Sequence, residues 1–241
     1  MKFKAVLFDL GSTLIEYENH DWPTLGKMGL VNAYPYMKKI FPELPELSQF
    51  GENFYRNLRY ILDNERPGYI EIDIYNACNR IFKRMGLALK DGLVEEFVEL
   101  YYKPVTEQIT VIPGAVEILS KIKKSDITIG LVSNSIFPEK FHLEEMENFG
   151  LREYFDFVIF SSSVGTRKPG KDIFNMALRN ARTEPSQAIY IGDKFDVDIY
   201  GAKNAGLVAV WKYHKGRENP ENIEPDYSIV NLGELETIIL Q

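Results

Sequence analysis

Residues 5–14 read AVLFDLGSTL, and this stretch decides how the rest of the chain is interpreted. Four apolar residues precede Asp9, as expected of a buried strand that ends in a carboxylate. Gly11 follows two residues later, so the next position on that face has no side chain. An aspartate at a strand end is often a turn former or a helix N-cap, and this stretch alone does not separate that role from a catalytic one.

The composition is that of an ordinary globular protein and excludes a typical nucleic-acid binder. Apolar residues make up 45% of the 241 residues, charged residues make up 26%, and the net charge is −7. The basic footprint of a nucleic-acid-binding surface is missing, and no apolar run is long enough to cross a bilayer. Cys78 is a single cysteine, which we expect to be a small buried hydrophobe. Because there is no disulfide framework and no secretory leader, we expect a cytoplasmic location.

Much of the chain alternates short apolar runs with amphipathic segments. The runs expected to be strands are residues 4–10, 128–134, 155–162, 188–193 and 207–213, with 226–230 as a further candidate. The segments expected to be helices between them are residues 114–124, 137–149, 172–181 and 198–206. This alternation predicts an α/β fold: a Rossmann-like, doubly wound parallel sheet with helices on both faces.

The segment between the first expected strand and the remaining ones has a different hydrophobic pattern. From residue 15 to residue 107 the pattern is helical; for example, Ile74, Cys78, Ile81 and Phe82 lie on one stripe. We therefore expect a core domain of residues 1–14 and 108–241, with an all-helical domain of residues 15–107 inserted into it. An insertion after the first strand lies at the edge of the sheet where ligands bind in open α/β folds, so we expect it to be a cap over a site.

Polar groups lie at the ends of four of the expected strands or directly after them. They are Asp9, then Ser133 and Asn134, then Lys168 in a loop, and finally Asp193, Asp196 and Asp198. Each group has an ordinary structural interpretation as a turn former, a cap or a solvated side chain. Together they form a coherent site for phosphoryl transfer. Mg²⁺ held by carboxylates would bridge a nucleophile and a phosphate, while the lysine and the serine hydroxyl would stabilise the phosphoryl charge.

These motifs resemble those of the haloacid dehalogenase superfamily, with a helical cap of the type inserted after the first strand. The matching segments are FDLGSTL, LVSNS, GTRKPGKDIF and IGDKFDVDIYGAKNAG. They occur in the order of the family's four motifs, and the resemblance covers essentially the whole chain. It implies a sheet with the strand order 5-4-1-2-3, in which the first and fourth strands are neighbours.

The resemblance also implies a function and a role for each site residue. The chain would be a Mg²⁺-dependent hydrolase of a small phosphorylated metabolite, a phosphate monoester, and Asp9 would be the nucleophile that becomes an aspartyl-phosphate. The implied Mg²⁺ ligands are Asp9, the backbone carbonyl of Gly11 and Asp193. Asp198 would be a further ligand or would bind the groups around the metal, with Asp196 as the less favoured substitute for it. Ser133, the backbone of Asn134, and Lys168 would hold the phosphoryl group.

Gly11 departs from the family's phosphatases, which usually carry a general acid/base aspartate at this position. Such a group contributes about 10²–10⁴-fold to the rate, so its loss predicts slow hydrolysis unless Glu16, Glu18 or metal-bound water replaces it. A second interpretation is a metal-binding regulatory protein of low activity. A third is a 2-haloacid dehalogenase, since halide departs without a general acid, but the acidic cluster suits a cation better than a carboxylate substrate. Phosphonate cleavage through a cap lysine is a further alternative.

Overall fold

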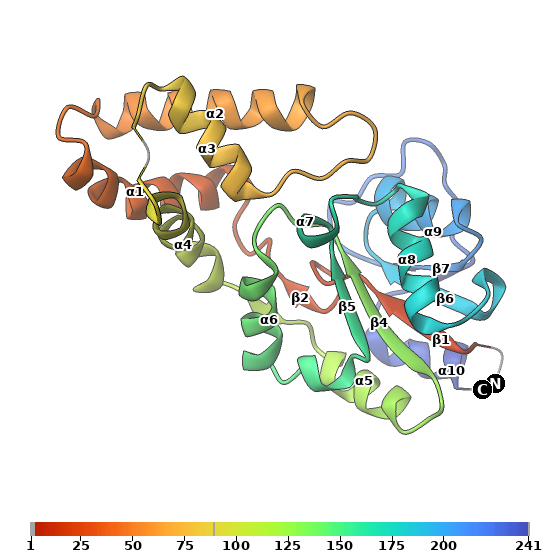
Figure 1. The fold of residues 1–241 in the computed structure, drawn as a ribbon. Coiled ribbons are helices and arrows are strands. Elements are labelled where there is room, and N and C mark those ends of the chain that lie inside the picture. Colours follow the sequence, from red (N-terminus) through yellow and green to blue (C-terminus); the bar gives the residue numbers. More distant parts are fainter. Residues whose placement is uncertain (1–2, 89, 241) are drawn as a thin grey trace. The chain divides into compact units, whose positions relative to one another are not determined.

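The computed structural model describes residues 3–88 and 90–240, and the chain divides into two compact units (Figure 1). The core unit consists of Met1–Glu16, Tyr69–Glu71 and Thr110–Gln241, and the helical unit consists of Tyr17–Gly68 and Ile72–Ile109. Each unit has its own interior.

A parallel sheet forms the centre of the core unit. Its strands are β1 (Ala5–Phe8), β4 (Thr128–Ser133), β5 (Phe157–Phe160), β6 (Ala188–Gly192), β7 (Val208–Lys212) and β8 (Tyr227–Ile229). Their spatial order is β5-β4-β1-β6-β7-β8, and every pairing is parallel. The expected order of the first five strands and the doubly wound sheet are therefore confirmed. The candidate strand at residues 226–230 is also confirmed, as the edge strand β8.

The register of the sheet brings the strand ends together at one edge. β1 lies between β4 and β6, with Phe8 opposite Leu131 on one side and opposite Ile191 on the other. The Asp9 backbone N–H continues the ladder by donating to the Ile191 carbonyl at 2.9 Å. The groups that follow β1 and β6 therefore lie at the same carboxyl edge of the sheet, as the resemblance implied.

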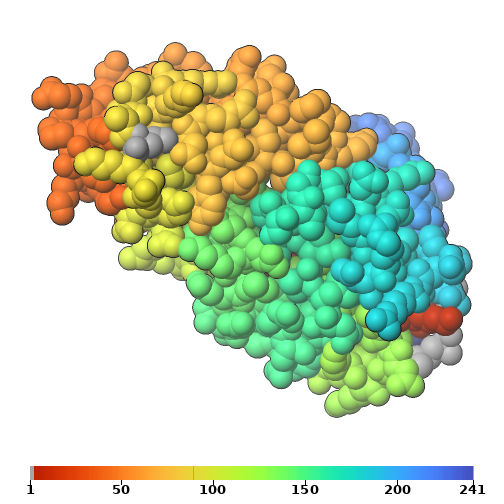
Figure 2. Space-filling model, viewed as in Figure 1, coloured from red at the N-terminus to blue at the C-terminus, as the bar shows by residue number. Residues whose placement is uncertain are grey.

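Helices cover both faces of the sheet. They are α5 (Ala115–Lys123), α6 (Glu139–Asn148), α7 (Ser161–Val164), α8 (Lys171–Ala181), α9 (Tyr200–Asn204) and α10 (Leu235–Ile239). On one face, Leu7, Val132 and Tyr190 pack in an apolar cluster with Phe174 of α8 and Ala202 of α9. Helix α5 contacts α10 and the sheet, and right-handed crossovers assign it to the other face. Figure 2 shows α8, in cyan, as part of the outer surface of this unit.

A second, short ladder in the core unit was not expected. β2 (Ile15–Glu16) pairs antiparallel with β3 (Thr110–Val111). The sequence pattern indicated helix from residue 15, and for these two residues it was wrong. Two residues are too few to show a strand periodicity, and their partners are distant in sequence, so local pattern carries no information about the pairing.

The helical unit consists of α1 (Trp22–Ile40), α2 (Leu47–Asn64), α3 (Ile74–Arg84) and α4 (Leu93–Thr106). Asp21 and Asp73 cap α1 and α3 by accepting hydrogen bonds from backbone N–H groups at 2.7 and 2.8 Å. Cys78 is a fully buried free cysteine on α3, as expected. Among the described residues, no helix has the length and hydropathy needed to cross a bilayer.

Aromatic rings fill the interior of the helical unit. Phe54 is fully buried, and its ring centroid lies 5.4 Å from that of Phe97 and 5.6 Å from that of Tyr101. Helices α1 and α4 approach closely at Gly29, where a Cβ would lie 2.3 Å from the Tyr101 carbonyl oxygen. A glycine is required there because any side chain would separate the two helices.

Candidate active site

Charged side chains are buried at the carboxyl edge of the core sheet. They are Asp9, Lys168, Asp193 and Asp198, and their exposed fractions are 7%, 1%, 0% and 1%. Asp9 follows β1 and Asp193 follows β6, and the pairing of these strands brings the two carboxylates together. The carboxylate oxygens of Asp9, Asp193 and Asp198 include atoms that all lie within 4.8 Å of one another. Buried charges at this density need partners, and the lysine is one of them.

Lys168 links the carboxylates. Its Nζ donates to Asp9 Oδ1 at 2.7 Å, to Asp198 Oδ1 at 2.7 Å and to the Tyr190 hydroxyl at 2.6 Å. Burial opposes the ammonium charge, but Asp198 and Asp9 outweigh it and raise the pKa of Lys168 above its ordinary value. The lysine is therefore a fixed cation beside the oxygen atoms of Asp9.

A π-helical turn, Phe195–Ile199, carries Asp198 into the cluster. The Lys194 backbone N–H donates to Asp198 Oδ2 at 2.9 Å, which leaves Oδ1 directed at Lys168. Gly192 makes room for this side chain, because a Cβ there would lie 2.5 Å from Asp198 Cβ. π-Helical turns are rare and occur frequently at functional sites. Asp196 is on the same turn but is exposed, so the geometry brings Asp198, and not Asp196, to the cluster.

Ser133 and Asn134 lie where β4 ends. Ser133 is 6% exposed and is the last residue of the strand. The Asn134 carboxamide binds the backbone of Lys168 twice: its Oδ1 accepts from the Lys168 N–H, and its Nδ2 donates to the Lys168 carbonyl, both at 2.9 Å. The predicted phosphoryl-binding residues of the second and third motifs are thus joined to each other directly.

The oxygen atoms of this cluster suit a divalent metal ion. Asp193 Oδ1 is buried and is among the described polar atoms that have no hydrogen-bond partner. Burial, with the neighbouring Asp198 and Asp9, raises the pKa of Asp193 from its ordinary 3.8 to about 7. Burial also raises the pKa of Asp9, although Lys168 opposes the shift. A cation among three such carboxylates would satisfy the bare oxygen and compensate their charge, and carboxylate oxygens are ligands that Mg²⁺ prefers.

Sequence reasoning missed two residues of the cluster. Tyr190, fully buried within β6, donates from its hydroxyl to the Val132 carbonyl at 3.0 Å and also lies 3.2 Å from Asp198 Oδ1. Arg217, in the loop between β7 and β8, donates from Nε to Asp193 Oδ2. The tyrosine was hidden in an apolar run, where a hydroxyl is the one polar signal. The arginine belongs to a loop without a recognised motif, so no sequence signal identified it.

The surroundings of Gly11 are also defined within the core unit. Glu16, a candidate for the missing acid, accepts from Ser12 Oγ at 3.2 Å and lies 3.0 Å from His214 Nε2. Glu18, the other candidate, belongs to the helical unit.

Known proteins resemble this chain in sequence. The family model for haloacid dehalogenase-like hydrolases matches residues 60–212, more than half of the chain. A glyceraldehyde 3-phosphate phosphatase of Pyrococcus furiosus is 28% identical over 247 residues, covering 97% of this chain and 92% of that protein. Pyrimidine 5′-nucleotidase YjjG of Escherichia coli is 36% identical over 142 residues, and that match covers 58% of this chain and 62% of the nucleotidase.

A solved structure extends the agreement to the whole fold. The crystal structure of a HAD phosphatase from Thermococcus onnurineus has a TM-score of 0.68 and 27% identity, covering 98% of both chains. The predicted family is therefore confirmed: the chain belongs to the haloacid dehalogenase-like hydrolases.

Proposed function

We propose that this chain is a Mg²⁺-dependent phosphatase that hydrolyses small phosphate monoesters through an aspartyl-phosphate on Asp9. The observation that carries the proposal is the buried cluster at the carboxyl edge of β1 and β6. It combines three carboxylates, a lysine cation and one Asp193 oxygen without a hydrogen-bond partner. The names of two relatives, a glyceraldehyde 3-phosphate phosphatase and a pyrimidine 5′-nucleotidase, support phosphate ester hydrolysis.

Asp9 is the proposed nucleophile. One of its carboxylate oxygens would attack phosphorus and form the new P–O bond as the bond to the substrate oxygen breaks. The departing oxygen would take its proton from water or from Glu16, since Gly11 carries no acid. Water would then attack the same phosphorus and release phosphate and the free carboxylate. Lys168, 2.7 Å from Asp9 Oδ1, keeps this carboxylate in place, and its charge would also offset that of the phosphoryl group.

Mg²⁺ would be held by Asp9, the Gly11 carbonyl, Asp193 and Asp198. When bound, the ion would supply positive charge between the nucleophile and the phosphate. The Ser133 hydroxyl and the Asn134 backbone N–H would donate to the phosphoryl oxygens. The Asn134 side chain has a further part, because its two bonds to the Lys168 backbone hold that lysine at the site.

The substrate would be a small phosphorylated metabolite, and the helical unit would act as the cap that selects it. Because Gly11 offers no acid to the departing oxygen, esters with good leaving groups should react faster than alkyl esters. Aryl phosphates, a triose phosphate and a pyrimidine nucleotide therefore form a suitable first panel, given the names of the relatives.

The test is phosphate release from p-nitrophenyl phosphate and this panel, with Mg²⁺ and with a chelator. Asp9→Asn should abolish release, on the order of 10³-fold or more, because the nucleophile is lost. Labelled substrate quenched in acid should leave a hydroxylamine-labile phosphate on the wild type and none on the variant. Asp196→Asn is the matched control, since it removes an exposed carboxylate of the same turn.

Two results would contradict the proposal. If no substrate of the panel releases phosphate in a reaction that requires both Mg²⁺ and Asp9, the regulatory protein of low activity is favoured. Chloride release from a 2-haloacid in the presence of chelator would favour the dehalogenase.

A further inference from the structure

We propose that Arg217 is a positioning residue for the metal, one that orients Asp193 and joins it to the turn carrying Gly11. This inference rests on the proposed function, because it takes the carboxylate cluster as the Mg²⁺ site. It concerns the loop between β7 and β8, which none of the sequence motifs includes.

Arg217 determines which Asp193 oxygen is available. Its Nε donates to Oδ2, whereas Oδ1 is the buried oxygen without a hydrogen-bond partner. The Asp193 carbonyl is also held, since Trp211 Nε1 donates to it at 2.9 Å. With its backbone and one carboxylate oxygen fixed, Asp193 has its other oxygen free for a metal ion. Partners of this kind, which bind the ligands of a metal, commonly set ligand orientation.

The same guanidinium reaches the turn after β1. Its Nη2 donates to Ser12 Oγ at 3.2 Å, and Ser12 adjoins Gly11, whose carbonyl is a proposed ligand. Ser12 has a φ of 56°, in the left-handed region, and its backbone N–H donates to the Ile15 carbonyl at 2.7 Å. A non-glycine residue persists in this conformation where surrounding bonds hold it. Arg217 therefore connects the two segments that supply ligands from β1 and β6.

Further hydrogen bonds connect the loop that carries Arg217 with the segment after β1. Ser12 Oγ donates to Glu16 Oε1 at 3.2 Å, and Glu16 Oε2 lies 3.0 Å from His214 Nε2. Arg217 and His214 come from the same loop, and Ser12 and Glu16 come from the segment after β1. The loop and the segment are thus joined at two points.

An alternative role for Arg217 predicts the opposite effect on metal binding. If Arg217 is only a counter-charge for Asp193, it repels the incoming cation, and removing it should strengthen Mg²⁺ binding. If it positions the ligands, removing it should weaken binding in spite of the relieved repulsion. The sign of the change in affinity therefore separates the two roles.

The experiment is titration of Mg²⁺ into metal-free protein by calorimetry, for wild type, Arg217→Ala, Arg217→Lys and Lys215→Ala. We expect Arg217→Ala to weaken binding by about 10–100-fold, the usual effect of losing such a partner. Arg217→Lys retains the charge but not the planar fork, so it should weaken binding as well. Lys215 is exposed in the same loop, and its removal should leave the affinity unchanged.

The possible results distinguish the role of Arg217 from the proposed function. The positioning role is overturned if folded Arg217→Ala binds Mg²⁺ as tightly as wild type or more tightly, with circular dichroism as the check on folding. If Arg217→Ala does not fold, Arg217→Lys takes its place. That variant must then bind Mg²⁺ more weakly than wild type. Wild-type protein that binds Mg²⁺ but releases no phosphate contradicts the proposed function and leaves the role of Arg217 standing. Wild-type protein that binds no divalent ion overturns both.

Discussion

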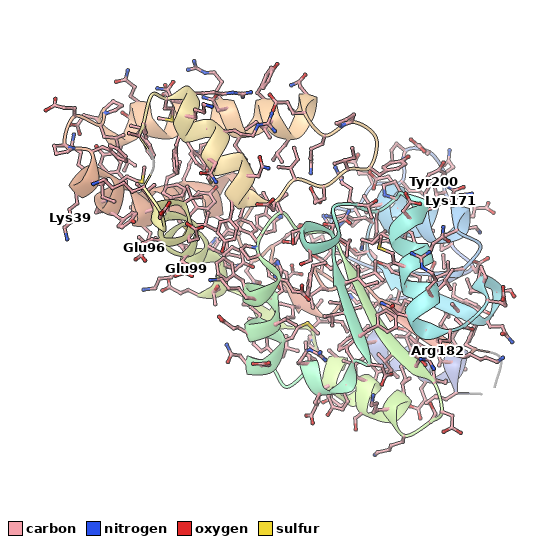
Figure 3. The ribbon with its side chains drawn as sticks, viewed as in Figure 1. Lys39, Glu96, Glu99, Lys171, Arg182 and Tyr200 are labelled. Atoms are coloured by element: carbon pink, nitrogen blue, oxygen red, sulfur yellow. The ribbon has the colours of Figure 1, made fainter. Side chains whose placement is uncertain are left out.

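The two units bury different kinds of side chain. In the helical unit, aromatic rings of Phe54, Phe82 and Phe97 fill the interior, with centroids 4.9–6.1 Å apart. None of the charged residues described in this unit is fully buried. Lys39, Glu96 and Glu99 are exposed, and Figure 3 shows them projecting from α1 and α4. In the core unit, by contrast, three carboxylates and a lysine are buried at the edge of the sheet.

The contrast distinguishes burial that stabilises the fold from burial that serves a reaction. Apolar burial stabilises a fold without specific partners, whereas a buried charge costs free energy unless it is paired. The core unit retains carboxylates whose pKa values are raised by burial, a stability cost that is consistent with selection for a reaction. Four variants test the distinction, in order of expected effect.

Lys168→Met should have the largest effect, because it leaves Asp9 and Asp198 buried without their cation. We expect the free energy of unfolding to fall by ~3–5 kcal/mol, the usual cost of breaking a buried pair. Phosphate release should fall by about 10²–10³-fold, as for the loss of one fixed donor to developing charge. Urea unfolding and a phosphate assay measure the two losses. Lys171→Met removes an exposed lysine of α8, labelled in Figure 3, and should change neither quantity.

Phe54→Ala should destabilise the protein by ~3–5 kcal/mol, because it removes a fully buried ring from the aromatic interior. The proposed metal site of the core unit should retain its affinity for Mg²⁺, measured by calorimetry at a temperature where the variant is folded. Tyr60→Ala, on the same helix but 52% exposed, is the control and should cost less than 1 kcal/mol, a value of about the size expected for surface positions. Equal losses for both variants would contradict the aromatic interior as the source of stability.

Gly11→Asp should restore general acid/base assistance. We expect a rate gain of up to ~10²-fold on alkyl phosphates and a smaller gain on aryl phosphates, whose leaving groups need no proton. The ratio of kcat/KM for the two ester classes measures the effect. An unchanged ratio would mean that another group already supplies the proton; Glu16→Gln then tests whether that group is Glu16.

Asp193→Asn should raise the stability of the metal-free protein. Because the folded-state pKa of Asp193 is about 7, well above its ordinary 3.8, its contribution to stability is lost as the pH rises through about 7. The variant should therefore melt above wild type at pH 8, by roughly 2–4 °C for each kcal/mol relieved, and the difference should shrink toward pH 5.

Mg²⁺ should raise the melting temperature of the wild type but not that of Asp193→Asn. Asp196→Asn should behave as wild type in both respects. A metal-free Asp193→Asn protein that melts below wild type at pH 8 would show that the Arg217 pair outweighs the burial cost.

The order of the strands and the residues at their ends could be predicted because the information is local. Apolar runs mark β1, β4 and β6, and Asp9, Ser133 and Asp193 stand within or directly after them, so parallel pairing is enough to bring them together. The choice between Asp196 and Asp198 was not decided locally. It depends on a π-helical turn and on the space left by Gly192, and neither has a periodicity that can be read in advance.

The sequence by itself determined the family, the parallel sheet and the main charged residues of the candidate site, since each depends on a short motif or a repeating pattern. Only the tertiary structure placed Tyr190 beside Lys168 and Arg217 beside Asp193. It also paired β2 with β3 and left Asp193 Oδ1 without a hydrogen-bond partner among the described residues. The physical reason is that these contacts join segments far apart in the chain. A strand or helix pattern reports the environment of one segment, whereas a hydrogen bond between segments depends on how both are placed.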